Sequence, residues 1–164
     1  MSTMARSRGL LARATLVLAL AVGAIAAAPT APAQAAGCWL TSCNDRDPQA
    51  MGCSTSSTYS PHEFTYMNSR FELRYSPNCN AMWSRVTNPS YTPPTSCNDT
   101  WISLQVLRNN RLIHQLIVQT PCGPGVGWTP MFGSFTAGAN YDYVRTCVHR
   151  VWYTSAPTAC TAAW

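Results

Sequence analysis

The chain has 164 residues, enough for one domain and too few for two domains with separate cores. Its 11 basic residues are all arginines, so the sequence excludes a P-loop nucleotide site, a Schiff-base lysine and a Ser-Lys dyad. The formal net charge is +5. Three of the arginines precede residue 37, and the remainder form no basic stripe, so a nucleic-acid partner is not expected.

Residues 1–36 are predicted to be a secretory signal peptide. A basic start is followed by the apolar run 14–28, which is short for a membrane span of about 20 residues. Ala33-Gln34-Ala35 supplies small residues around a cleavage site. We therefore expect a secreted, extracellular domain over 37–164 that has no membrane contact after cleavage. A retained anchor and lipidation of Cys38 are the alternatives.

All eight cysteines follow the predicted cleavage point, at positions 38, 43, 53, 79, 97, 122, 147 and 160. An even number confined to an exported domain predicts four disulfides in an oxidising compartment. Zinc is the competing interpretation, but the chain has no C-x-x-C pair and no Cys-His knuckle spacing. Neither a metal nor a cofactor is expected.

The mature chain shows alternation of period two, interrupted by Pro, Gly, Asn and Ser. This pattern predicts an all-β domain, either a small antiparallel sandwich or a partly open barrel, without a helix longer than two turns. Residues 37–60 are expected to be a loop region held by disulfides. The expected strands lie at 62–67, 71–75, 81–87, 100–108, 111–119, 127–132 and 141–153.

Asn109-Asn110 separates two strand-like runs and is suited to a type I′ turn, because Asn tolerates positive φ. A regular register would place Ile102 opposite Ile117 and Val106 opposite Ile113. It would also place Cys97 opposite Cys122, at a site where Cα atoms approach to about 4.5 Å. This register predicts a Cys97–Cys122 disulfide. A bulge or a longer loop would break it.

Two motifs occupy the first half of the mature chain. The first is Cys38-x4-Cys43-x3-Asp47-Pro48-x3-Gly52-Cys53, and the second is Leu73-Arg74-Tyr75-Ser76-x2-Cys79-x-Ala81-x-Trp83-x-Arg85. With Thr129-Pro130-Met131 and the late Cys147 and Cys160-Thr161, they resemble the YjfA-like family of exported Gram-positive, mostly actinobacterial, proteins, domain of unknown function 2690. The resemblance implies an exported fold and no established activity.

Cys97 and Cys122 lie outside this family pattern, as expected for an extra pair bonded to each other. Cys147–Cys160 is the expected C-terminal bridge. The remaining cysteines, 38, 43, 53 and 79, can pair in three ways, and the sequence leaves that choice open.

The sequence contains no catalytic motif, and no catalytic residue is assigned. Asp45 and Asp47 fall short of the six or more oxygen ligands of a calcium site. The chain has no nucleophile elbow. The three histidines, at 62, 114 and 149, are interpreted as ordinary sheet or loop residues. The remaining acids, Glu63, Glu72, Asp99 and Asp142, are each explained by a surface strand or turn.

Tryptophans near loops or a terminus are the candidate partner-binding residues, because Trp is enriched in binding hot spots. They are Trp128, the first choice, with Trp39 and Trp164. The sequence therefore favours a secreted, non-enzymatic module that binds a protein or cell-wall partner, such as an adaptor in an extracellular or toxin-like assembly. The alternatives are a small hydrolase using His114, His149 and Asp142, or a peptidase inhibitor presenting 88–97.

Overall fold

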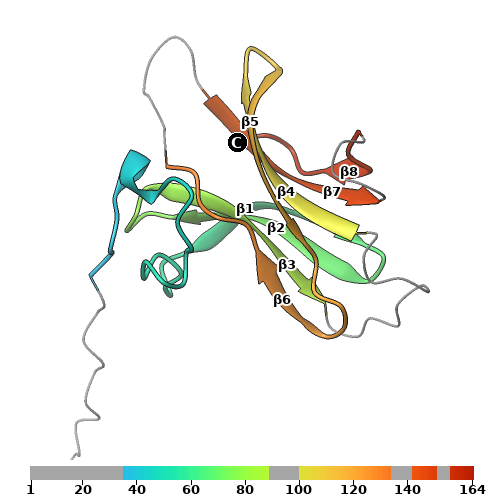
Figure 1. Ribbon diagram of the computed structural model, residues 1–164, viewed down its shortest axis with the longest axis horizontal. Helices are drawn as coiled ribbons and strands as arrows, with labels where there is room; N and C mark the ends of the chain where they lie inside the picture. The colour runs from blue at the N-terminus through green and yellow to red at the C-terminus, as the bar shows by residue number, and fades with distance from the viewer. Residues whose placement is uncertain (1–34, 89–99, 134–141, 151–155) are drawn as a thin grey trace, which may run out of the picture. The chain divides into compact units, whose positions relative to one another are not determined.

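The computed structural model describes residues 35–88, 100–133, 142–150 and 156–164 (Figure 1). A single 3-10 turn, η1, covers Leu40–Cys43. Strands account for most of the other regular structure, as the alternation predicts. They are β1 (Tyr59–Tyr66), β2 (Ser69–Ser76), β3 (Ala81–Asn88), β4 (Thr100–Arg108), β5 (Arg111–Gln119), β6 (Gly125–Trp128), β7 (Asp142–Arg150) and β8 (Ala159–Cys160).

The strands form two antiparallel sheets, which we name sheet A and sheet B. Sheet A has the order β1-β2-β3-β6, and sheet B has the order β5-β4-β7-β8 (Figure 1). The sheets do not close into a barrel, so the predicted sandwich is confirmed and the barrel alternative is not. The short strand β8 was not predicted from the sequence.

Apolar side chains from both sheets meet in the core. Leu73 and Met82 of sheet A pack in one cluster with Leu104, Val106 and Val144 of sheet B, and all five are fully buried. Alternate residues of a strand point to opposite faces, so one row from each strand supplies this core.

A buried polar contact also links the two sheets. The hydroxyl groups of Ser84 and Thr146 lie 2.8 Å apart, and Ser84 Oγ also donates to the carbonyl oxygen of Ser103. These bonds satisfy polar groups that would otherwise be costly to bury, and they fix how the two sheets face each other.

The β4–β5 hairpin turns at the predicted residues, with φ values of 51° at Asn109 and 60° at Asn110. Arg108 pairs with Arg111 as expected, but the register shifts at a bulge between Val106 and Leu107. Beyond the bulge Val106 faces His114 and not Ile113.

The predicted register is therefore wrong for most of the hairpin, and Ile102 faces Val118 rather than Ile117. A β-bulge adds one residue to one strand, so every later pair moves by one position. Register can no longer support a bond between Cys97 and Cys122.

Among the residues that the structure describes, three disulfides form, Cys38–Cys43, Cys53–Cys79 and Cys147–Cys160. The last is the expected C-terminal bridge, and the first two select one of the three pairings that the sequence left open. Cys38–Cys43 and Cys53–Cys79 pack on Ala81 and Trp83 of β3. This packing anchors the predicted loop region against the face of sheet A that points away from sheet B.

We expect Cys97 and Cys122 to form the fourth disulfide, now by elimination, since the other six cysteines are paired. Cys97 lies outside the described residues, and Cys122 is exposed after β5. Non-reducing peptide mapping should recover one peptide pair linked through these two cysteines. A Cys97 peptide joined to any other cysteine would contradict the assignment.

Candidate binding surface

Trp128, the first-choice partner residue, is partly buried and engaged within the chain. Its indole Nε1 donates to Asp47 Oδ2 at 2.8 Å, and Trp128 packs against the core cluster that contains the Cys38–Cys43 and Cys53–Cys79 disulfides. These contacts tie β6 to the N-terminal loop region. They give Trp128 a structural role, whatever it contributes to binding.

Asp47 accepts the hydrogen bond from the Trp128 indole. Burial alone would raise the pKa of Asp47, but hydrogen bonds from the Ala50 amide, the Trp128 indole and the Gln49 amide outweigh it and lower the pKa. Asp47 Oδ1 accepts from the Gln49 and Ala50 amides at 2.8 and 2.9 Å. The carboxylate therefore caps a turn.

Trp39 and Trp164 present more of their rings to solvent, with exposed fractions of 54% and 41%. Trp39 precedes η1, where its backbone amide donates to Ser42 Oγ at 2.8 Å. Trp164 ends the chain, and its backbone amide and carbonyl both bond to Val144 of β7. The C-terminal tryptophan is therefore held at a fixed place beside sheet B.

Trp164 belongs to a row of three rings, which we call the aromatic ladder: Tyr59, Tyr75 and Trp164. The Tyr59 and Tyr75 ring centroids are 5.5 Å apart, and those of Tyr75 and Trp164 are 5.0 Å apart. Tyr59 and Tyr75 are cross-strand partners of β1 and β2, so the ladder joins sheet A to the C-terminus. Its two end rings are exposed and its middle ring is half-buried.

Tyr75 is the fixed centre of the ladder. Its hydroxyl donates to Asn80 Oδ1 at 2.9 Å. Burial, reinforced by the neighbouring Tyr59, raises the pKa of Tyr75, so the phenol keeps its proton for this bond at physiological pH. The alternation of Tyr75 with Leu73 and Phe71 marks it as core-facing, but no sequence signal shows that Trp164 returns to it.

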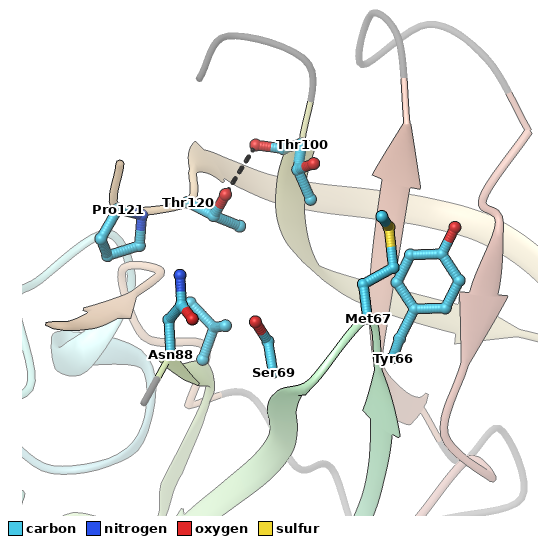
Figure 2. A pocket seen from close by; sticks show the side chains of 8 residues that line it. Tyr66, Met67, Ser69, Asn88, Thr100, Thr120 and Pro121 are labelled. Carbon is cyan, nitrogen blue, oxygen red and sulfur yellow. Dashed lines mark hydrogen bonds between the residues drawn. The ribbon is translucent and has the colours of Figure 1, made fainter. Parts of the chain in front are cut away.

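A hollow lies at the end of the sandwich where β3 ends and β4 begins (Figure 2). It measures about 340 Å³ including its open mouth. Figure 2 shows Thr120 Oγ1 donating to the carbonyl oxygen of Thr100, at 3.1 Å. The described lining is neutral and holds no carboxylate, histidine or arginine; it comprises Tyr66, Met67, Ser69, Val86, Asn88, Thr100, Thr120 and Pro121. This composition suits a neutral group.

The residues expected of a hydrolase do not converge. His114 lies beside the core, with its ring centroid 5.8 Å from that of Phe132. His149 lies on the face of sheet B opposite to the face that carries His114. There its Nε2 atom is 2.8 Å from Ser103 Oγ. Asp142 begins β7 and His149 is next to its end, so the strand holds them apart.

Glu72 is the acid that sequence analysis placed wrongly. It was interpreted as a surface residue, but its side chain is fully buried. Arg85 donates to both of its carboxylate oxygens, at 2.7 and 2.8 Å, and Ser60 Oγ donates at 2.8 Å. Arg74 adds a contact at 3.5 Å. Every oxygen of this buried carboxylate is therefore paired, which is the arrangement of a structural ion cluster.

These features define a small antiparallel β-sandwich braced by disulfides, with exposed aromatic rings at one edge. The family described as Protein of unknown function (DUF2690) matches residues 41–131. This is more than half of the chain, and the chain belongs to that family. No curated protein and no solved structure matches the chain. Within the described residues, no helix has the length and apolar character needed to cross a membrane.

Proposed function

We propose that this chain is a secreted, non-enzymatic protein-binding module and that the aromatic ladder makes the central contact with its partner. The basic and apolar start of the sequence supports export, and three disulfides suit an oxidising compartment. The single observation that carries the binding role is the pair of exposed rings, Tyr59 and Trp164, that contact the half-buried Tyr75 edge-to-face and at a tilt.

The ladder has the properties of an interface anchor. Tyr and Trp offer a large apolar area with few rotatable bonds, so binding immobilises little side-chain entropy. Here the rings are also restrained before any partner arrives, by ring contacts and by the backbone bonds of Trp164 to Val144. A preorganised surface loses less free energy on association than a mobile one.

The experiment begins with the oxidised protein as bait for secreted proteins, followed by affinity measurement with the captured partner. Trp164→Ala should weaken binding by about 2 kcal/mol or more, about thirtyfold in Kd, because it removes an anchor ring. Tyr59→Ala should have the same direction of effect.

Trp39→Ala tests the rival position, because Trp39 is the other exposed tryptophan among the candidate partner-binding residues. Circular dichroism should show that each variant keeps its β structure. If Trp39→Ala weakens binding and Trp164→Ala does not, the contact lies near η1 and the ladder assignment is wrong. Turnover of the captured protein by the wild-type chain would instead support an enzyme.

A further inference from the structure

The two N-terminal disulfides lie in contact with each other. The Sγ atoms of Cys38, Cys43, Cys53 and Cys79 all lie within 4.8 Å of one another, and those of Cys38 and Cys53, which belong to different disulfides, are 3.6 Å apart. Three of the four cysteines are fully buried, and Cys38 is 9% exposed. Four sulfur atoms from two distant stretches of sequence therefore form one compact cluster.

Across the two disulfides the sulfur spacing is close to that of a zinc site, and the bonded pairs Cys38–Cys43 and Cys53–Cys79 must separate on reduction to complete it. A tetrahedral Zn²⁺ bound by four thiolates at about 2.3 Å has sulfur atoms roughly 3.8 Å apart, close to the Cys38–Cys53 separation. Cys38 and Cys43 are also separated by four residues, a spacing found in zinc-ligand pairs. We propose that these four cysteines bind one zinc ion as a tetrathiolate whenever both disulfides are reduced.

Backbone hydrogen bonds hold the cysteines in place independently of the S–S bonds. The Leu40 amide donates to the Cys79 carbonyl at 2.9 Å, the Cys53 amide donates to the Pro48 carbonyl at 2.9 Å, and the Arg46 amide donates to the Cys43 carbonyl at 3.1 Å. The buried Trp83 and Met131 pack around the sulfur atoms. Reduction therefore leaves four thiols already gathered, which lowers the ordering cost of metal binding.

The oxidised chain with two disulfides and the reduced chain with bound zinc interconvert with electrons and protons in balance. Reducing both disulfides yields four thiols and takes four electrons from the reductant, either thiols that become disulfides and also give the four protons, or a phosphine that becomes its oxide while water gives the protons. Zn²⁺ then replaces the thiol protons as the sulfur atoms become thiolates, so binding releases up to four protons. Zinc itself is not oxidised or reduced. A disulfide oxidant that accepts four electrons, and is itself reduced to thiols, re-forms the two disulfides, removes the thiolates and expels the metal.

The test uses the full chain in two forms, oxidised and reduced by a phosphine under argon. Each is titrated with Zn²⁺, followed by native mass spectrometry, and with Co²⁺, whose d–d absorption reports tetrahedral thiolate coordination. We expect one metal ion per reduced chain and none per oxidised chain. Cys53→Ala and Cys79→Ala should each abolish the tetrathiolate spectrum. The double variant Cys147→Ala/Cys160→Ala should keep it.

Alkylation mapping locates the metal directly. Zinc should slow the modification of Cys38, Cys43, Cys53 and Cys79 in the reduced chain and leave the rate at Cys147 unchanged. The proposal fails if the reduced chain binds no zinc, including because it unfolds. It also fails if the Cys53→Ala variant binds zinc as the wild type does, or if protection maps to other cysteines.

Discussion

Glu72→Gln is expected to lower the free energy of unfolding by about 3–5 kcal/mol at neutral pH. The carboxylate is fully buried, and Arg85 donates to both of its oxygens. An amide of the same shape removes the negative charge and leaves the partly buried guanidinium without compensation. Urea denaturation at pH 7 measures the loss.

Glu63→Gln is the matched control. Glu63 is the cross-strand neighbour of Glu72 and pairs with Arg70, but both of these side chains are about half exposed. Exposed ion pairs contribute about 0–1 kcal/mol, so this variant should remain close to wild type. Equal losses in the two variants would contradict a special role for the buried cluster.

The same carboxylate makes stability depend on pH. Burial alone would raise the pKa of Glu72, but hydrogen bonds from Arg85 and Ser60 and the charges of Arg85 and Arg70 outweigh it and lower the pKa below its ordinary 4.5. The unfolded chain therefore binds this proton at higher pH than the folded chain. The stabilisation is complete above about pH 4.5 and is lost as pH falls through the lowered pKa. Glu72→Gln should remove this part of the acid sensitivity.

Local patterns predicted most of the strands, because each pattern reports a local preference. The alternation of Phe71, Leu73 and Tyr75 marks one face of β2, and Asn109-Asn110 tolerates the positive φ of its turn. The bulge beside Leu107 left no such mark, since no Gly, Pro or other turn residue stands at Ile113, the residue that the register skips. β8 is two residues long, too short for any period to show.

The candidate site was predicted only in part. Trp164 was identified as an exposed aromatic, but its contact with Tyr75 depends on the chain end pairing with β7, a non-local event. Glu72 alternates with core residues and therefore points away from sheet B, which alone suggests a surface position. Its carboxylate is enclosed by the side chains of Ser60, Arg74 and Arg85, and residue spacing does not report these contacts.

The position of the η1 segment depends on Gly133, a glycine far away in the sequence. Gly133→Ala is expected to lower the free energy of unfolding by about 2–3 kcal/mol. A Cβ at Gly133 would lie 2.0 Å from the Leu40 carbonyl oxygen and 2.6 Å from its carbon. These are backbone atoms, so no side-chain rotation relieves the contact.

Leu40 cannot move away easily, and this constraint makes the contact at Gly133 costly. Its φ of 50° is in the left-handed region, and its amide is bonded to the Cys79 carbonyl at 2.9 Å. Gly125→Ala is the matched control, since its Cβ would meet Pro121 at an ordinary 3.6 Å. That change should be within about 0.5 kcal/mol of wild type. Equal thermal stability of the two variants would mean that the η1 segment shifts without cost, and that Gly133 does not fix its position.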